Sequence, residues 1–557
     1  MENNMRTFAY SALALALVGL SLGHLSACSN SSGDCNATAT CGAASGTASN
    51  TSGTGAGGST EGGSDGAGTS NTGGGGGGSA GAGGTVECEG DVSDDAACWA
   101  NNEHGVFVSN AHGNDVTGNG TKESPYASIT KGLSSAAGKK VFVCLGLKGD
   151  YTDELSFNGS EDVSIYGGFE CDSWEYSTTR KAGIKPAKNI ALRINNSKNL
   201  TFENLRIMAA DATGKDYDAS SYGAFVTDSS GVVFRRVEIT AGKGAKGADG
   251  EPGVKGADGA GPDVGQVGEP GKCDGAATAD GVPGKWPAAV CGGTRGGSGG
   301  IGVLDTDGGS GASGIPSTNV TPPNVKNLGA GATSMGVEGD PGKAGSAGTQ
   351  GSLGESAPQL GTFSASGYVA ASGNAGTDGF PGQGGGGGGA SLGRLGCRGA
   401  SGGAGGMGGC GGGAGSGGMG GGASVGVMSV NSGVALESCT VKSTAAGMGG
   451  GGGNGGGLGV GGSGGDGGAP DGTGKVARGG KGGAGGNGGI GGSGSGGTGG
   501  ASYALVFAGT TPLYVAGDTT LTPGDGGAAG PGGQVDAEAP KAPDGAEGIS
   551  GIELEIQ

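Results

Sequence analysis

Large apolar and aromatic side chains are scarce in this chain. Only 33% of its 557 residues are hydrophobic and 4% are aromatic, whereas 148 are glycine. This composition excludes one large globular core, because too few side chains are present to fill it. We expect about half of the chain to fold around apolar contacts.

Basic residues and histidines are also few. The chain has 31 Lys and Arg against 50 Asp and Glu, a formal net charge of −19. Nucleic acids and anionic membrane surfaces bind through basic patches, so this balance excludes nucleic acid as a partner. His104 and His112 are the only histidines after residue 28, and no cysteine spacing matches a zinc site. We therefore expect no zinc site and no cofactor, with Ca²⁺ as the alternative.

One mostly apolar run, residues 8–22, follows Arg6 and is too short to span a bilayer comfortably. It is typical of an export signal. The residues that follow, Leu25-Ser26-Ala27-Cys28, resemble the bacterial lipobox. This resemblance implies that Cys28 carries acyl chains, palmitate among them, and becomes the first residue of the exported protein. Ser29 resembles the residue that permits sorting to the Gram-negative outer membrane.

The export signal and lipobox predict a lipid-anchored protein of the outer membrane or cell surface, with the membrane as a partner through its lipid. An ordinary secretory signal peptide is the alternative. Residues 29–85 are almost entirely Ser, Gly, Thr and Ala. They have little to bury, so we predict a flexible linker between residues 1–28 and the folded part.

One apolar pattern occurs three times farther along the chain. In each copy two apolar residues lie two apart, a step of three follows, and a second pair lies two apart. The copies are Leu200, Phe202, Leu205 and Ile207; Val232, Phe234, Val237 and Ile239; and Val434, Leu436, Cys439 and Val441. A spacing of two is that of a strand with one buried face, and the step of three requires a bend. With the short apolar run that precedes each copy, one repeat predicts one coil of an all-β solenoid, and neighbouring coils must stack to bury that face.

Two weaker copies flank these three. Leu155, Phe157, Val163 and Ile165 fit the first half of the pattern, but Gly168 and Glu170 stand where the second apolar pair should be. Leu513 and Val515 form the later copy, followed by Asp518 and Thr520. Successive copies are 37, 32, 202 and 79 residues apart. If a coil needs about 32 residues, insertions of about 170 and 47 residues interrupt the solenoid.

These spacings divide the folded part into five segments. We expect the cap and first coils in residues 86–241, a glycine-rich insertion in 242–421, and another coil in 422–446. A second insertion would occupy 447–500, and the last coil and tail 501–557.

A short helix is predicted just before the coils. Ser124 and Pro125 form an N-cap and first-turn pair, and Tyr126, Ile129 and Leu133 fall on one helical face. The order of a strand at 105–109, this helix and a strand at 139–144 resembles the N-terminal cap of pectin-lyase-like proteins. That resemblance implies a right-handed parallel β-helix. The resemblance also implies a candidate activity, the cleavage of acidic polysaccharides, because most enzymes of that fold carry out this reaction.

Glycine occurs in two patterns. Every third residue is glycine from Gly244 to Gly259 and from Gly336 to Gly354, which resembles collagen, whereas Gly479 to Ile490 follows a Gly-Gly-x pattern that resembles the repeats of mycobacterial surface proteins. The collagen-like runs break too soon for a stable triple helix of three chains. We predict a sheaf of extended, polyglycine-II-like helices beside the solenoid; disordered insertions are the alternative.

Twelve cysteines in an exported chain indicate disulfides. Pairing neighbours in the sequence predicts Cys35 with Cys41, Cys88 with Cys98, Cys144 with Cys171, Cys273 with Cys291, and Cys397 with Cys410, although spacing alone cannot fix the connectivity. Cys439 is left over at an inward position of a coil, where a free cysteine acts as a small apolar side chain.

Few candidate catalytic residues lie on the coils. Asp228, Arg235 and Arg236 are the groove candidates, with Glu203 and Glu238 facing outward nearby. A hydrolase needs two carboxylates projecting from successive coils, and a lyase needs a base with calcium held by carboxylates. Residues 305–308 begin like a calcium loop but lack the later acidic ligand, so a turn is expected there. Sugar rings could stack on three tryptophans, Trp99, Trp174 and Trp286. The default expectation is that these side chains pack in the core or in loops.

The sequence as a whole favours a structural or adhesive surface protein that is not an enzyme. Its partners would be extracellular polysaccharide or other surface proteins. A lyase or hydrolase acting on acidic polysaccharide along the coils is one alternative, and a carbohydrate-binding surface module is another.

Overall fold

The computed structural model describes residues 88–215, 219–261, 266–273, 280–285, 291 and 293–557. Cys28, Cys35, Cys41, the predicted linker and Trp286 lie outside these residues. In the described part strands predominate, and the helices α1 (Ala96–Trp99) and α2 (Ile129–Ser135) are short. No helix among the described residues has the length and apolar character needed to cross a membrane.

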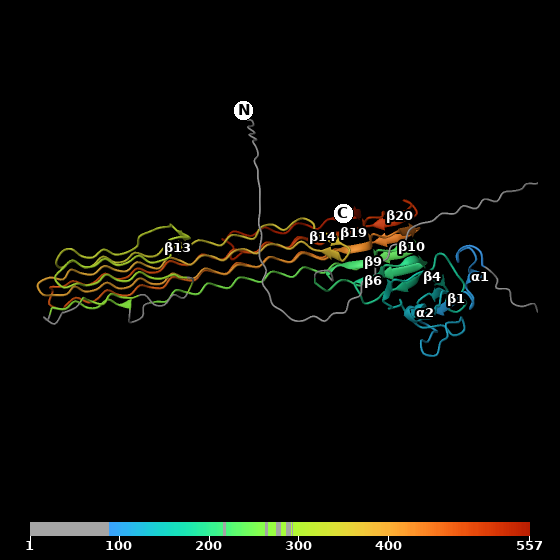
Figure 1. Cartoon of the computed structure of the whole chain (residues 1–557), viewed down its shortest axis with the longest axis horizontal. Coiled ribbons are helices and arrows are strands. Elements are labelled where there is room, and N and C mark those ends of the chain that lie inside the picture. Colours follow the sequence, from blue (N-terminus) through green and yellow to red (C-terminus); the bar gives the residue numbers. More distant parts are fainter. Residues whose placement is uncertain (1–87, 216–218, 262–265, 274–279, 286–290, 292) are drawn as a thin grey trace, which may run out of the picture. The chain divides into compact units, whose positions relative to one another are not determined.

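Three parallel sheets form the strand-rich part (Figure 1). Sheet A contains β1 (Gly105–Val108), β2 (Lys140–Cys144), β4 (Ser164–Phe169), β7 (Lys198–Glu203), β10 (Ser230–Arg235), β17 (Val434–Glu437) and β20 (Leu513–Tyr514). Sheet B contains β5 (Ala182–Ile184), β8 (Leu205–Met208), β11 (Glu238–Thr240), β18 (Thr440–Lys442) and β21 (Thr520–Thr522). Sheet C contains β3 (Leu155–Asn158), β6 (Ile190–Asn195), β9 (Ser221–Thr227), β16 (Ser424–Val430), β19 (Ser502–Ala508) and β22 (Ser550–Glu555). From β6 onward the chain visits C, A and B in turn, an arrangement compatible with a parallel β-helix.

The apolar repeat places equivalent residues in register between coils. Leu200 lies beside Val232, which lies beside Val434, and the same offset aligns Ile207, Ile239 and Val441. All twelve residues predicted to face inward are at most 2% exposed and belong to one apolar cluster. The core is therefore a column of aliphatic and aromatic side chains that runs along the stacking direction.

Both imperfect copies are completed by residues that the sequence pattern missed. In the early coil, Ala182 and Ile184 of β5 replace the apolar pair expected near Gly168, because the loop after β4 delays the third strand. In the late coil the predicted register is wrong by one residue. Tyr514 pairs with Leu436 and packs against the core, whereas Leu513 is 73% exposed.

The turn between sheets C and A explains a second recurring feature of the sequence. Asn196, Asp228 and Asn431 occupy the same turn position with positive φ angles of 47°, 48° and 50°, a conformation that Asn and Asp tolerate better than most residues. The serine after each of them is buried and lies in a stack. The amide of Ser197 donates to Oγ of Ser229 at 3.0 Å, and the amide of Ser229 donates to Oγ of Ser432 at 3.1 Å.

The predicted cap helix is present but begins four residues later than expected. Ser128, not Ser124, is the N-cap, and its side chain accepts a hydrogen bond from the amide of Lys131. Tyr126 lies before the helix and bridges to Val108 of β1. Backbone pairing with β1 therefore holds the chain extended through the position where Pro125 predicted a first turn.

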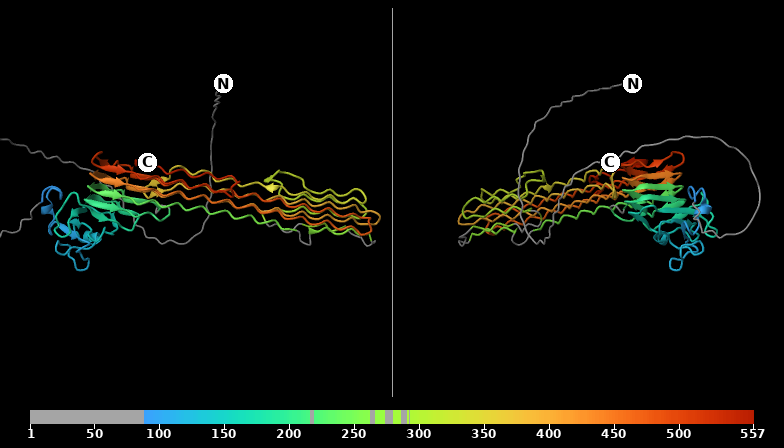
Figure 2. Two further views of the ribbon diagram at one scale, coloured as in Figure 1. Left: turned by 180° about the vertical axis from the view of Figure 1, so that it is seen from behind. Right: turned by 45° about the vertical axis from the view of Figure 1, so that its right-hand side comes forward.

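Four connections of twelve residues or more run from the end of a sheet-B strand to the start of a sheet-C strand: 209–220, 241–423, 443–501 and 523–549. We call the last three the glycine sheaf. Figures 1 and 2 show its extended segments lying side by side. It includes two short antiparallel pairs, β12 (Val320–Thr321) with β13 (Ala347–Gly348) and β14 (Thr362–Ser364) with β15 (Gly367–Val369).

Main-chain hydrogen bonds with a period of three connect the sheaf. Gly250 and Gly253 donate to Gly451 and Asn454, a parallel pair, while Gly453 donates to Ser416 in an antiparallel pair. Segment 404–421 exchanges such bonds with segments near residues 248, 453, 489 and 379. A β-strand has only two neighbours in its sheet, whereas a helix with three residues per turn points its amides in three directions. Segment 404–421 therefore bonds to more neighbouring segments than a β-strand does, and these bonds lie within one chain.

The number of glycines in each group of three residues matches the number of sides on which that segment contacts other backbones. In residues 244–259, glycine occupies only the position that faces the sheaf; a Cβ on Gly253 would lie 2.0 Å from a carbonyl oxygen. In residues 403–421, two of three positions are crowded, as at Gly405 and Gly406. In residues 384–389, all three positions are crowded, and all six residues are glycine.

We predict opposite effects for alanine at two adjacent glycines. A Cβ at Gly456 would lie 1.9 Å from the carbonyl oxygen of Val254, whereas at Gly457 its nearest neighbour is a side-chain carbon of Lys255 at 3.7 Å. Gly456→Ala should lower the free energy of unfolding by about 1–3 kcal/mol because two backbones must separate. Gly457→Ala should change it little or raise it by about 0.4–1 kcal/mol. Denaturant unfolding of both variants checks this, and equal effects would contradict the steric account.

Candidate functional site

A column of outward side chains crosses sheet A and contains the predicted groove arginines. In register from one coil to the next it runs Tyr166, Glu203, Arg235 and Glu437. Acidic and basic groups therefore alternate about 4.8 Å apart along the stack. This alternation favours pairing between the coils instead of a surface that is free to bind substrate.

Glu203 is the centre of this charged cluster and is completely buried. Its Oε1 lies 2.5 Å from Nη2 of Arg236 and 2.6 Å from the hydroxyl of Tyr176, and its Oε2 lies 3.4 Å from Nη1 of Arg235. Arg235 also contacts Glu437 at 2.6 Å and Asp91 at 2.8 Å. Both arginines and the carboxylate thus have ionic partners already, which leaves Glu203 poorly placed to act as a base or nucleophile.

Burial shifts the acid–base behaviour of the groups around Glu203. It raises the pKa of Tyr166 to about 12, with the nearby Glu203 carboxylate adding to the effect. The pKa of Tyr176 is also raised, first by burial and then by its hydrogen bond to Glu203. Both phenols therefore stay protonated at neutral pH, where Tyr176 donates to the carboxylate. Burial lowers the pKa of the Lys140 ammonium.

The sequence did not identify Asp91, Tyr176 and Asn204 as members of this cluster. Asn204 Oδ1 accepts from Nε of Arg236 at 3.1 Å, and its Nδ2 donates to Tyr176 at 2.8 Å. Asn204 and Arg236 hold the same bend position with positive φ angles of 50° and 52°. Because this bend recurs in the repeat, the sequence could have placed Asn204 beside Arg236. Asp91 and Tyr176 lie in loops that have no counterpart in the repeat, so their positions could not be predicted.

Asp228 does not join the predicted groove. It lies before β10 in the turn between sheets C and A, where its Oδ1 accepts from Nδ2 of Asn431 at 3.3 Å. Arg235 is at the other end of β10, separated from Asp228 by the length of that strand. The structure therefore separates this carboxylate from the arginines with which it was grouped.

The remaining candidate residues pack or stabilise turns. Trp174 is 7% exposed and packs edge-on against Phe107 at 4.7 Å, and the Trp99 indole donates to the carbonyl of Gly90. His112 pairs with Asp172 at 3.0 Å on the surface. Asp305 Oδ1 accepts a hydrogen bond from the amide of Gly396 at 2.8 Å.

Four disulfides occur among the described residues. Cys88–Cys98 and Cys144–Cys171 join sequence neighbours as expected. The predicted pairings Cys273 with Cys291 and Cys397 with Cys410 are wrong, because the bonds are Cys273–Cys397 and Cys291–Cys410. The predicted pair of Cys35 and Cys41 lies outside the described residues. Segments distant in sequence lie side by side in the sheaf, where Lys272 bridges Arg398, so spatial neighbours differ from sequence neighbours. Cys439 is a free, buried thiol whose pKa burial raises to about 11.

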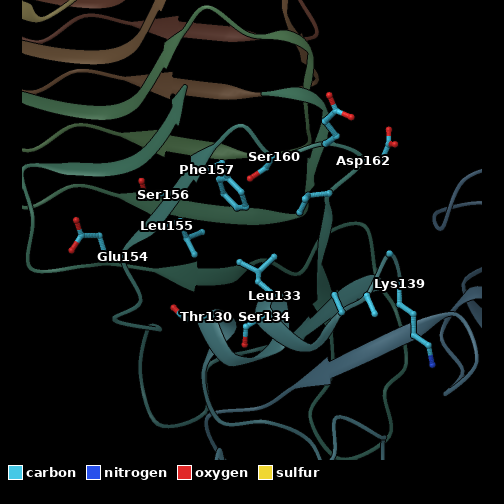
Figure 3. A pocket seen from close by; sticks show the side chains of 15 residues that line it. Thr130, Leu133, Ser134, Lys139, Glu154, Leu155, Ser156, Phe157, Ser160 and Asp162 are labelled. Carbon is cyan, nitrogen blue, oxygen red and sulfur yellow. The ribbon is translucent and has the colours of Figure 1, made fainter. Parts of the chain in front are cut away.

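A cavity of about 390 Å³ lies at the N-terminal end of the coils, between α2 and β3 (Figure 3). Figure 3 shows Leu133 of α2 near Leu155 and Phe157 of β3. Its charged lining consists of the carboxylates of Glu154, Glu161 and Asp162 and the ammonium of Lys139. Two of these carboxylates are already paired, Glu154 with Lys188 at 3.9 Å and Glu161 with Lys198 at 3.4 Å.

Charged residues line the outer ridge of the collagen-like segment at three-residue intervals, interrupted by Pro252. Lys246 pairs with Asp249 at 2.9 Å and Lys255 with Asp258 at 3.2 Å. Each aspartate also accepts from a main-chain amide of the adjacent segment: Asp249 from Gly451 at 2.7 Å and Asp258 from Val460 at 2.8 Å. Side-chain carboxylates thus bind amides at the edge of the sheaf.

Comparison of the chain with protein-family models, with curated proteins and with solved structures finds no match. The class that the described residues define is a β-rich protein with parallel sheets and disulfides. Function must therefore be argued from the residues themselves.

We predict that Glu203→Gln lowers the free energy of unfolding by roughly 3 kcal/mol, because it leaves the partly buried Arg236 without the buried carboxylate that pairs with it. Glu161→Gln is the matched control, since Glu161 pairs with Lys198 at 3.4 Å on the exposed surface and its loss should cost less than about 1 kcal/mol. Denaturant unfolding monitored by circular dichroism measures both. Similar losses in the two variants would show that the cluster is not a stabilising centre.

Acid should loosen the edge of the sheaf. The pKa of Asp249 is lowered first by its bond to Lys246 and then by the Gly451 amide, and that of Asp258 first by the Val460 amide and then by Lys255. A carboxylate with a lowered folded-state pKa stabilises the fold above its unfolded value of about 3.9, and this contribution is lost as pH falls through the folded value.

The measurement is hydrogen exchange at Gly451 and Val460 between about pH 5 and 2, corrected for intrinsic rates; protection should fall as the carboxylates are protonated. In Asp258→Asn the amide oxygen still accepts but does not titrate. The pH dependence at Val460 should then disappear. An unchanged profile in that variant would assign the effect to other groups.

Proposed function

We propose that this protein is a lipid-anchored surface protein with a structural or adhesive role, in which a right-handed parallel β-helix of the pectin-lyase-like kind carries the glycine sheaf. The lipobox-like run that ends at Cys28 supports the anchor. Its acyl chains would hold the protein at the outer membrane or cell surface.

The observation that carries this proposal is the main-chain bonding of the sheaf. Where the segments pack most tightly, in residues 384–389, every Cβ position is blocked by a neighbouring backbone. Such an array has almost no side chains to shape a catalytic pocket, but its dense hydrogen bonds make it stiff. A stiff element that presents loops and surface side chains suits spacing or adhesion better than turnover.

The charged cluster on sheet A also supports a role without catalysis. Among the described residues, Glu203 is ion-paired with Arg235 and Arg236. Asp228 lies outside this cluster, where it contacts Asn431. A hydrolase of this kind would need two carboxylates facing a groove from successive coils, one of them able to hold a proton near neutral pH. Glu203, held between two guanidinium groups, is unsuited to that task.

The test uses the full chain produced in a Gram-negative host. We expect labelled palmitate to be incorporated into the wild-type protein and not into Cys28→Ser, and cells displaying the wild type to adhere to surfaces or to one another. Cys28→Ser should be exported but released from the membrane, with loss of adhesion. Acidic polysaccharides incubated with the protein, with and without calcium, should yield no new unsaturated or reducing ends.

Two results would contradict the proposal. Palmitate incorporation that survives Cys28→Ser would remove the anchor. Time-dependent release of sugar ends, abolished by Arg235→Ala or Arg236→Ala, would make the protein an enzyme that acts along sheet A.

A further inference from the structure

A loop with many side chains interrupts the glycine sheaf. Residues 315–328 contain no glycine and form the longest run of this kind in the insertion 242–421. The loop includes β12, which pairs with β13, labelled on the sheaf in Figure 1. Since the segments of the sheaf contact one another through glycine backbones, their packing gives no reason for such a loop. The loop is therefore a candidate for a function of its own.

Two fully buried amide side chains fix this loop on the sheaf. Gln383 interrupts a run of glycines, and its Nε2 donates to the carbonyls of Gly314 and Val325, both at 3.1 Å. Asn327 Oδ1 accepts from the amide of Gly314 at 3.0 Å, and its Nδ2 donates to the carbonyl of Gly384 at 2.8 Å. Both side chains are 0% exposed. The backbone at both ends of the loop is therefore held in place before any ligand binds.

A cavity of about 420 Å³ lies beside this fixed backbone. Its size falls within the usual range of small-molecule sites, about 300–1,000 Å³. Part of the lining is apolar and comes from Ile315, Val325 and Leu328. Besides the buried Gln383, the polar side chains in the lining are those of Ser313, Ser317, Asn324 and Lys326. Among the described residues these four polar side chains have no hydrogen-bond or ionic partner within the protein, so they are free to bind a ligand.

The charge at this cavity is positive, in contrast to the net charge of −19 of the chain. Lys326 is the single charged residue in 308–337, and none of the described residues that line the cavity is acidic. Two further basic residues, Arg295 and Lys343, lie on segments whose backbones bond to the loop. Asp340, the nearest acidic residue on these segments, bonds through its amide beyond the end of the loop. The cavity therefore favours an anionic ligand.

An extended peptide is a poor fit for this cavity, because such a peptide binds mainly through main-chain bonds. The amide and carbonyl of Gly314 already bond to Asn327 and Gln383. Those of Ile315 bond to the backbone of Arg295 at 2.9 and 3.0 Å. The groups that remain free are hydroxyls, a carboxamide and an ammonium. They suit a ligand that has several hydroxyls and a negative charge.

We propose that this cavity binds a sugar unit that carries a carboxylate. The carboxylate pairs with the ammonium of Lys326, and the sugar hydroxyls bond to the side chains of Ser313, Ser317 and Asn324. The carbon face of the ring lies on the apolar part of the lining. This site rests on the adhesive role proposed above, because it names the class of ligand to which the sheaf attaches.

The test measures binding of sodium glucuronate to the purified full chain at low salt, by isothermal titration calorimetry or saturation-transfer NMR. Glucose tests the need for the carboxylate, and acetate tests the need for the hydroxyls. We expect saturable binding of glucuronate, with glucose and acetate each binding about tenfold or more weakly.

Variants locate the site on the chain. Lys326→Gln should bind glucuronate about tenfold or more weakly, because a charge-assisted bond is lost. Lys481→Gln is the matched control: it removes the same charge elsewhere on the sheaf, where Lys481 pairs with Asp466 at 3.3 Å, and it should bind like wild type. Ser313→Ala should weaken binding by roughly threefold to tenfold. Unfolding midpoints equal to wild type show that the fold is retained.

Three results would overturn this proposal: no saturable binding of glucuronate to the wild type, equal binding by Lys326→Gln, or equal binding of glucose or acetate. None of them would affect palmitate labelling or cell adhesion, so the lipid anchor and the adhesive role would stand. Conversely, a failure of the anchor in the Cys28→Ser test would not change binding measured on the purified chain.

Discussion

Main-chain hydrogen bonding between chain segments that lie side by side is the interaction on which the rest of this structure depends. In the coils it runs through three parallel sheets, and side chains such as Leu200 and Val232 stack as a consequence of the register. In the sheaf the same bonds recur at every third residue of the segments, and there the close approach of backbones excludes side chains. One physical requirement thus produces an aliphatic core in one part and a glycine core in the other.

Charged side chains and the N-terminal end of the coils cannot be buried by stacking of apolar side chains, and the structure accommodates each in a different way. On sheet A, Glu203 is buried between two arginines, so an acidic position in the repeat is neutralised by the next coil. At the N-terminal end, α2 and the segments at Tyr126 and Tyr151 cover much of the opening. The edge of β3 remains beside a cavity with an apolar floor. The paired charges on sheet A stabilise the fold.

Prediction from the sequence succeeded where a repeat existed. The aliphatic register identified twelve core residues, because side-chain direction alternates strictly along a strand. It failed at Leu513, where a two-residue strand gives the period too little length, and at Ser124, where pairing with β1 overrode a good helix start. The grouping of Asp228 with Arg235 failed because linear proximity ignores the strand that separates them.

The sequence by itself determined the register of the three strong coils and the need for them to stack, since both follow from local spacing. It left open whether the glycine-rich insertions are extended or disordered. Only the tertiary structure decided which segments became neighbours. It joined Cys273 to Cys397 and brought Asp91 and Tyr176 to the charged cluster. These contacts join segments separated by loops of irregular length. Because such loops have no repeating sequence pattern, the sequence does not show which segments they bring together.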